Sequence, residues 1–410
     1  MRRVFIISFL FVLFVDGVLV AQNNTNSPYT RYGYGRLDDP AFGRCLGMGG
    51  LSIGLRGISN VNPANPASYS AVDSMTFIFD MGISGSLSRF ASAGSQRTTG
   101  TGNLDYLAIQ FSATKWMGVS FGLMPYSSVG YDFGSIDSVF YDSNYLKYSQ
   151  KYKGSGGISQ VYLGLSFNLW KRLSIGANAY FLWGEMLHNR KLDLGSSYYS
   201  SDITANLHVR SFNFRYGLQY TERIAKKHVL TLGLAYENRS RLRGTYEEML
   251  IDVDTMIISK DSPLQLPSFY GAGISYNYDD RLTIGVDYSL YEFSKAKSFN
   301  VNSIDSLNNR HKWVLGAEYI HDPNGLRYVD RMRWRLGGDL TTSYISPKVI
   351  DYGITIGVGF PLKTAKTILN VAFEYDKIGK SAKGFIREDY FKLSFNATIN
   401  ETWFFKSKIR

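Results

Sequence analysis

Apolar residues alternate with small or polar residues along most of this chain, in runs of roughly ten residues that each end in a turn. In one run Leu163, Leu165 and Phe167 alternate with Gly164 and Ser166. Successive side chains of a β-strand point to opposite faces, so each run has one apolar and one small or polar face. The pattern predicts fourteen strands, at approximately 74–90, 104–113, 117–129, 158–170, 173–184, 206–221, 228–238, 268–277, 282–291, 311–320, 332–342, 350–360, 367–376 and 389–399.

The connections between these strands mostly alternate in length. Short ones fall at 114–116, 171–172, 222–227, 278–281 and 361–366, and long ones at 130–157, 185–205, 239–267 and 292–310, while 343–349 is shorter than this rule expects. A soluble sandwich also shows alternation, but short periplasmic turns and long outer loops indicate a bacterial outer-membrane barrel. No run of about 18 uncharged apolar residues follows the N-terminus, which excludes helical spans. The fold class predicted is all-β, a transmembrane antiparallel β-barrel of about 14 strands.

The first 73 residues do not follow the strand pattern. Arg2 and Arg3 precede an almost wholly apolar stretch at 4–15, and Ala21 offers a small residue for cleavage, which predicts a signal peptide over 1–21. Residues 22–73 are rich in Gly, Asn, Pro and Ser. Because a fourteen-stranded barrel encloses more space than its own side chains fill, we expect 22–73 to form a hatch, or plug, inside the lumen. Residues 74–410 then form the barrel.

Composition and charge support export to a bacterial surface. The formal net charge is +11, but the basic residues are scattered, so a surface facing anionic lipid or lipopolysaccharide explains them better than nucleic acid does. The 30 Tyr and 26 Phe suit the aromatic girdles of a membrane barrel. Cys45 is the only cysteine, so no internal disulfide is available. The expected location is the cell outer membrane of a Gram-negative bacterium.

Two short motifs carry a family resemblance. The sequence LGMGG at 46–50 is followed by Asn62-Pro63-Ala64, and MPYSSVG stands at 124–130. With these motifs the chain resembles the FadL-like family of long-chain fatty-acid outer-membrane transporters. The resemblance implies a 14-stranded barrel with an N-terminal hatch, through which fatty-acid-like or aromatic compounds pass by way of an apolar lumen pocket and leave sideways into the membrane. The family also has a non-transport branch, a barrel subunit of the type IX secretion apparatus, and this alternative stays open.

The glycines and the tandem Asn-Pro-Ala triplets are the predicted hatch and substrate-path residues. Neither a strand before nor a helix after the glycines supports a nucleotide loop. The two prolines restrict the backbone to extended or turn geometry, so the triplets form either a rigid elbow or a surface that shapes the exit. The residues are Gly47, Gly49, Gly50, Asn62, Pro63, Ala64, Asn65, Pro66 and Ala67.

Pro125 and three arginines are the remaining candidates. Proline cannot donate to a strand ladder, so Pro125 marks either a lateral opening or an ordinary strand end. Arg36, Arg44 and Arg56 could contact a substrate carboxylate or belong to a lattice of ion pairs that holds the hatch. Partners for such a lattice lie on the polar strand faces, at Arg215, Glu237, Asp287, Glu318 and Glu374.

No catalytic residue, metal ligand or cofactor is predicted. The five histidines are not spaced as a ligand set, and no Gly-x-Ser-x-Gly elbow occurs. The sequence therefore favours a passive uptake channel for hydrophobic small molecules. An accessory or shuttle barrel of a protein secretion apparatus is the alternative, and an outer-membrane lipid-modifying enzyme a third hypothesis. Expected partners are those small molecules, outer-membrane lipid and lipopolysaccharide, the barrel-assembly machinery during biogenesis, and secretion-system subunits under the alternative.

Overall fold

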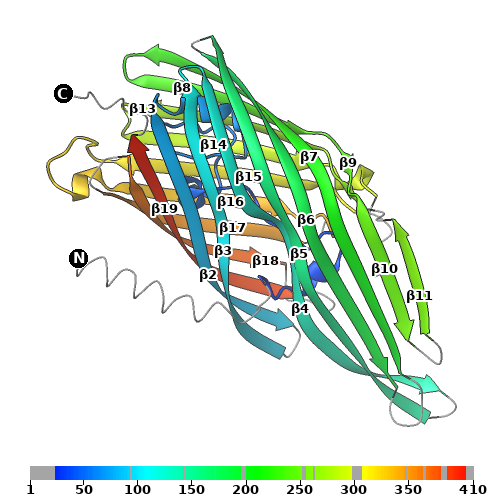
Figure 1. Cartoon of the computed structure of the whole chain (residues 1–410). Helices are drawn as coiled ribbons and strands as arrows, with labels where there is room; N and C mark the ends of the chain where they lie inside the picture. Colours follow the sequence, from blue (N-terminus) through cyan, green and yellow to red (C-terminus); the bar gives the residue numbers. More distant parts are fainter. Residues whose placement is uncertain are drawn as a thin grey trace, which may run out of the picture.

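Fourteen antiparallel strands close into a barrel in the computed structural model (Figure 1), because the last strand, β19, pairs with the first barrel strand, β2. The structure describes residues 24–92, 95–141, 144–170, 172–194, 200–251, 255–261, 264–297, 307–346, 349–362, 366–379 and 386–402. The expected signal peptide, 1–21, lies outside the described residues.

Each of the fourteen predicted strands is present at its expected place, and the all-β fold class is confirmed. The short connections predicted from the sequence lie at one end of the barrel, together with the start of β2 and the end of β19. The barrel strands are β2 (Thr76–Ser92), β3 (Ser95–Thr114), β4 (Met117–Tyr141), β5 (Asn144–Trp170), β6 (Leu173–Asp193), β7 (Ser201–Ala225), β8 (His228–Glu237), β13 (Phe269–Tyr278), β14 (Leu282–Tyr291), β15 (Arg310–Ile320), β16 (Arg333–Thr342), β17 (Ile350–Pro361), β18 (Ile368–Ile378) and β19 (Arg387–Thr402).

Three of the long loops expected from the sequence contain strands instead. Residues 130–157 and 185–205 mostly extend β4, β5, β6 and β7, and 239–267 holds β9 (Ser240–Arg241), β10 (Gly244–Ile251), β11 (Thr255–Asp261) and β12 (Gln265–Leu266). A tilted strand crosses a membrane in about 9–11 residues, so β5, with 27, continues well beyond it. The prediction stopped each strand where its apolar face ended, although backbone pairing continues in water.

The side chains of the barrel strands alternate between an exposed outer face and a buried inner face. Leu165 and Leu232 are 37% and 43% exposed, whereas the neighbouring Ser166 and Thr231 are buried. The predicted lumen charges also lie inside: Arg215, Glu237, Asp287 and Glu318 are buried. The strand register derived from the sequence is therefore confirmed.

Arginine substitutions are expected to locate the membrane band. Leu165→Arg and Leu232→Arg should each cost roughly 2–4 kcal/mol of folding free energy, because the outer wall faces hydrocarbon. Ile136→Arg is the matched control: Ile136 is 81% exposed on the part of β4 beyond the membrane, so its cost should stay within about 0.5 kcal/mol. Unfolding in urea from lipid vesicles measures all three. Equal losses at Ile136 and Leu165 would contradict this placement of the band.

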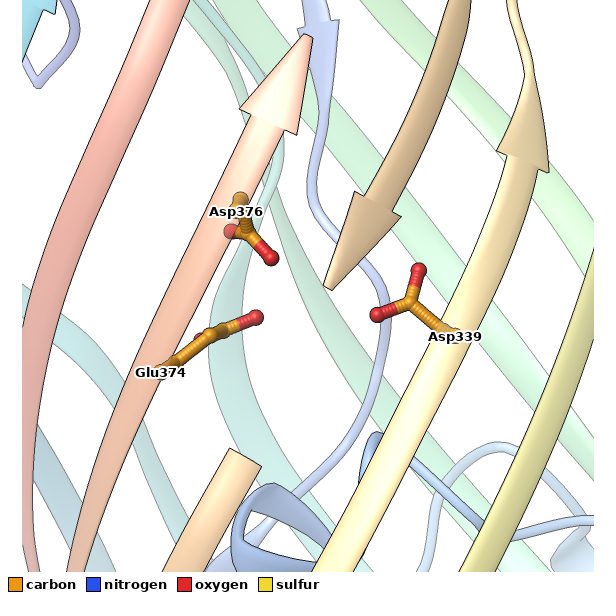
Figure 2. Close-up of side chains that lie close together, drawn as sticks. All are labelled: Asp339, Glu374 and Asp376. Carbon is orange, nitrogen blue, oxygen red and sulfur yellow. The ribbon is translucent and has the colours of Figure 1, made fainter. Parts of the chain in front are cut away.

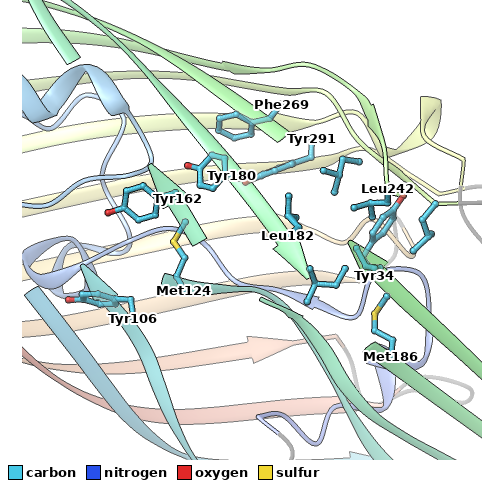
Figure 3. Close-up of a cluster of buried hydrophobic side chains, with 14 of the residues drawn as sticks. Tyr34, Tyr106, Met124, Tyr162, Tyr180, Leu182, Met186, Leu242, Phe269 and Tyr291 are labelled. Carbon is cyan, nitrogen blue, oxygen red and sulfur yellow. The ribbon is translucent and has the colours of Figure 1, made fainter. Parts of the chain in front are cut away.

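Residues 24–73, called the lumen segment below, lie against the inner faces of the strands. The lumen segment contains β1 (Arg36–Leu37) and the 3₁₀ helices η1 (Pro28–Arg31), η2 (Gly43–Met48) and η3 (Pro66–Ala71). Tyr34, Phe42 and Tyr69 from it join the buried cluster formed by the strands, shown in part in Figure 3. Two further 3₁₀ helices, η4 (Phe293–Lys295) and η5 (Val329–Arg331), lie in barrel connections. No helix among the described residues is long and apolar enough to cross a membrane.

Glycines on the strands let the lumen segment approach the wall closely. A Cβ atom added to Gly118 would lie 2.2 Å from the Tyr69 carbonyl oxygen, and one added to Gly233 would lie 2.0 Å from that of Ile53. Such distances are far below van der Waals contact, so only glycine fits at these positions. These strand glycines therefore allow the backbone of the lumen segment to pack directly against the barrel wall.

Candidate functional site

Strands β3 and β4 separate at the position of Pro125. Their pairing runs from Thr114 and Met117 to Leu107 and Leu123, and within the described residues no register joins them beyond that point. On its other side β4 stays paired with β5, through an irregularity between Pro125 and Ser127. The wall of the barrel is thus interrupted between the outer parts of β3 and β4.

The lumen segment covers part of the free edge of β4. Strand β1 pairs antiparallel with it, with Arg36 opposite Ser128 and Leu37 opposite Ser127, and the Asp38 amide donates to the Tyr126 carbonyl at 3.0 Å. The Ser128 hydroxyl also donates to Asp38 at 3.0 Å, and the Thr30 hydroxyl accepts from the Gly130 amide and donates to the Gly130 carbonyl, both at 3.2 Å. The strand pairing of this cover is nevertheless only two residues long, much shorter than that of a barrel strand.

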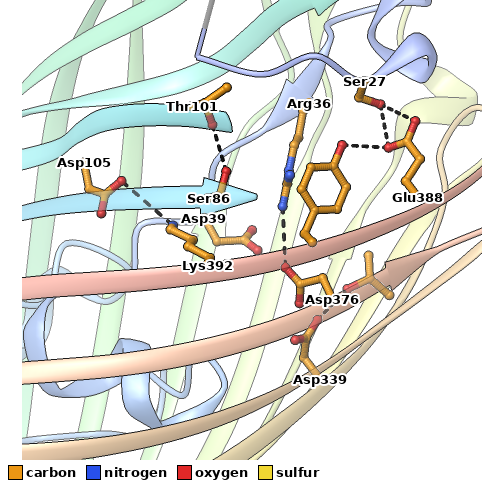
Figure 4. Close-up of polar contacts among 12 residues, drawn as sticks. Ser27, Arg36, Asp39, Ser86, Thr101, Asp105, Asp339, Asp376, Glu388 and Lys392 are labelled. Atoms are coloured by element: carbon orange, nitrogen blue, oxygen red, sulfur yellow. Dashed lines mark hydrogen bonds and ion pairs between the residues drawn. The ribbon is translucent and has the colours of Figure 1, made fainter. Parts of the chain in front are cut away.

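A cavity of about 220 Å³ lies beside this break and reaches Pro125. Its lining includes apolar side chains, among them Leu37, Phe42 and Met124, so a hydrophobic group can be accommodated. It is not the apolar pocket expected from the family resemblance, however, because charged residues from six barrel strands and the lumen segment also line it (shown in part in Figure 4). These are Arg36, Asp38, Asp39, Asp105, Arg310, Lys312, Asp339, Asp351, Glu374, Asp376 and Lys392.

Three of these carboxylates, Asp339 on β16 and Glu374 and Asp376 on β18, point toward one another (Figure 2). One oxygen from each lies within 4.8 Å of the others. Basic groups stand next to them: Lys312 Nζ is 3.5 Å from Asp339, and Arg36 Nη2 is 3.6 Å from Asp376. The cavity therefore combines both signs of charge, with acids more numerous than bases.

Two of the three candidate arginines have acidic neighbours in the barrel. Arg36 lines the cavity, contacts Asp376 and lies over the ring of Tyr390 at 4.4 Å. Arg44 Nη2 lies 3.4 Å from Glu318, which also accepts from Arg335 at 2.6 Å. Of the two, Arg36 faces the space that a substrate carboxylate could enter, while Arg44 belongs to a buried ion-pair group.

The tandem Asn-Pro-Ala triplets are bound to the wall formed by β5, β6 and β7. Asn62 donates to the Ser52 carbonyl at 2.6 Å, within the lumen segment, and the Pro63 carbonyl accepts from Asn178 at 3.0 Å. The Ala67 carbonyl accepts from Ser166 at 2.9 Å.

The third candidate arginine, Arg56, also donates to the Ala67 carbonyl, at 2.8 Å. The remaining members of the triplets make similar local contacts, with Ala64 accepting from Arg215, Asn65 donating to Ile53, and Pro66 beginning η3.

The candidate glycines lie against β16 and β17. Gly49 has a φ of 70°, and a Cβ there would lie 2.7 Å from the Gly338 amide nitrogen. A Cβ on Gly47 would lie 3.0 Å from the Gly357 Cα. Gly49 and Gly50 also line the cavity. Close approach of two backbones, rather than phosphate binding, explains why glycine stands here.

Two anchors of the lumen segment were not foreseen in these roles. Asp287, on β14, accepts from the amides of Ser52, Ile53 and Gly54 at 2.6, 2.7 and 3.1 Å. In the sequence, Asp287 could be identified only as an acidic residue on the polar face of a predicted strand.

Asp39 of the lumen segment is the second anchor. It contacts Arg310 at 3.1 Å and Lys312 at 2.7 Å. Burial by itself would raise the pKa of Asp39, but Arg310 and Lys312 together hold it well below its usual range. The carboxylate therefore stays ionised and keeps both barrel cations paired.

Comparison with solved structures places this architecture among known barrels. The CymD monoaromatic hydrocarbon channel is 13% identical, and the match covers 90% of this chain and 99% of that one with a TM-score of 0.60. The toluene transporter TbuX of Ralstonia pickettii is 14% identical over 90% and 100% of the two chains, with a TM-score of 0.60. A FadL homologue of Pseudomonas aeruginosa is 14% identical over 91% and 100%, also with a TM-score of 0.60. At such identities the likeness establishes a common fold.

Fourteen strands closed around the chain's own N-terminal segment therefore give this protein the same barrel fold as these channels and the FadL homologue. The chain belongs to the BamG family, whose family model matches residues 1–410. No curated protein sequence matches it.

Proposed function

We propose that this protein is a passive channel of the Gram-negative outer membrane that takes up hydrophobic or amphipathic small molecules and releases them sideways between β3 and β4. The interrupted pairing beside Pro125 is the observation that supports the proposal, because an internal cavity reaches Pro125 at a part of the wall where β3 and β4 do not pair. The fold is shared with proteins described as a monoaromatic hydrocarbon channel and toluene transporters, which supports the substrate class.

The lumen segment is the hatch in this proposal, as expected for 22–73. Its strand β1 covers the β4 edge, so β1 has to leave before a molecule can pass. The mixed lining favours an amphipathic molecule, whose apolar part lies near Met124 and whose polar end meets Arg36 or Lys392. No bond is made or broken, so no catalytic group or cofactor enters the mechanism.

Fixing β1 to β4 is expected to abolish uptake. Leu37 and Ser127 are directly opposite, and facing residues of antiparallel strands are about 4.5–5.5 Å apart at Cα, a separation that a disulfide can bridge. The Leu37→Cys/Ser127→Cys protein should take up a labelled aromatic hydrocarbon only after reduction. Cys45 will not interfere, since burial raises the pKa of its thiol to about 11.

The control is a disulfide in the part of the wall where β3 and β4 stay paired. Ile109 and Phe121 are opposite one another there, so Ile109→Cys/Phe121→Cys should leave uptake unchanged in both redox states. Full uptake by the oxidised Leu37→Cys/Ser127→Cys protein would reject the lateral route and the gating role of β1.

A second candidate function is an accessory barrel of a protein secretion apparatus. It is favoured by the strands that project beyond the membrane, which a small-molecule channel does not require. Strands β4 to β7 and the β10–β11 hairpin form this projection at the end opposite the short turns (Figure 1).

A further inference from the structure

Within the described residues, the projecting sheet ends in a strand, β11, that is paired along one edge only. Strand β10 pairs with the outer part of β7, from Gly244 opposite Val209 to Ile251 opposite Asp202, and β11 pairs with β10 over its whole length. Among the described residues β11 is in register with β10 alone, and Figure 1 shows it as the outermost strand. An unpaired strand edge offers a row of backbone donors and acceptors to another chain.

Large apolar side chains are exposed on both faces of this hairpin. Met256, Ile257 and Ile258 are 57%, 68% and 40% exposed, and Met249 faces Ile257 across the strand pair. The outer part of β6 carries exposed Glu185 beside His208, so this region is beyond the apolar band and lipid does not cover it. Exposed apolar groups in water at a free strand edge are typical of protein contacts.

The hairpin is acidic, although the whole chain is basic. The formal net charge of the chain is +11, but residues 244–261 contain one basic residue, Lys260, and five acidic ones. The acidic residues are Glu247, Glu248, Asp252, Asp254 and Asp261. Of the described carboxylates, Glu247, Glu248 and Asp261 lie on the paired strands β10 and β11. A partner that complements this edge therefore carries basic residues.

We propose that β11 is a docking edge at which a partner protein adds a basic β-strand with apolar side chains. Strand addition satisfies the free backbone groups, and alternate side chains of the added strand meet the apolar groups and the carboxylates. This inference rests on the second candidate function and identifies its contact surface; it is independent of uptake through the lumen.

A peptide of alternating Lys and Val is the probe, with a peptide of alternating Glu and Val for comparison. Binding to the full chain in nanodiscs should favour the Lys peptide by about tenfold or more and weaken as salt rises. A formal net charge of +11 does not by itself attract a basic peptide, so a preference that depends on the hairpin carboxylates reports binding at the hairpin. Amide exchange should slow in 255–261 when the peptide binds.

The variant Glu247→Lys/Glu248→Lys/Asp261→Lys should remove this preference. Asp137→Lys/Glu185→Lys, which changes exposed carboxylates on β4 and β6, should retain it. Retained binding by the triple variant, or no preference in the native chain, overturns the proposal. A third outcome would also overturn it: the native chain binds no peptide but forms dimers, and these dimers are lost in Ile257→Asp. The edge would then be a contact with a second copy of the chain. The disulfide test in the lumen is unaffected by any of these outcomes.

Discussion

Valine in place of Gly118, Gly233 or Gly337 is expected to force the lumen segment away from the wall and open the barrel to ions. The added Cβ would lie 2.2, 2.0 and 2.1 Å from backbone atoms of Tyr69, Ile53 and Met48, respectively. Backbone cannot move aside as a flexible side chain can, so each substitution should cost the packed state about 3 kcal/mol or more. Conductance in planar bilayers measures the opening.

Gly102→Val is the matched control, because a Cβ at Gly102 meets nothing within 4 Å and the residue lies on a barrel strand. It should fold and stay closed. The barrel itself should survive the other substitutions, since its strand pairing does not involve the lumen segment except at β1. If the three valine variants conduct no better than Gly102→Val, the lumen segment is not the seal, and the hatch proposal has to be abandoned.

Removing the carboxylate of Glu318 is expected to destabilise the protein by about 3–5 kcal/mol, because it leaves buried guanidinium groups without their counter-charge. Glu318 and Arg335 are 4% and 1% exposed at their side chains, and Arg44 of the lumen segment shares the same carboxylate. The Glu318→Ala variant should therefore unfold at much lower urea concentration in lipid vesicles.

The triple variant Arg44→Leu/Glu318→Leu/Arg335→Met tests the reason for that loss. It removes the three ion-paired charges together, so its stability should return to within about 1–2 kcal/mol of the native protein. Should the triple variant be as unstable as Glu318→Ala, packing volume rather than unpaired charge would account for the effect.

The sequence alone determined the strands and their faces. A two-residue period is a local property, and lipid on one side of a wall selects apolar residues there whatever the rest of the chain does. The alternation within each strand is therefore sufficient to place Leu165 and Leu232 outside and Glu318 and Asp287 inside. The site of the wall break was also local, since Pro125 lacks the donor that a ladder needs.

The tertiary structure alone decided which neighbour β4 loses at Pro125 and what lies behind the break. A missing donor does not say whether β3 or β5 separates, and the choice follows from β1 occupying the free edge. The ion pair of Arg44 with Glu318 joins residues far apart in sequence, because closing the barrel brings opposite walls to the lumen segment. No periodicity along the chain encodes such pairs.

The projecting hairpins were missed for a related reason. The apolar face that reveals a membrane strand ends where the lipid ends, but β4 to β7 continue because each has a paired neighbour. Pairing between β10 and β7 connects segments whose own alternation is weak. The side-chain pattern of a strand shows whether each face meets lipid, water or the protein interior. The length of a strand beyond the membrane depends instead on hydrogen bonds to neighbouring strands, and these neighbours are known only from the folded sheet.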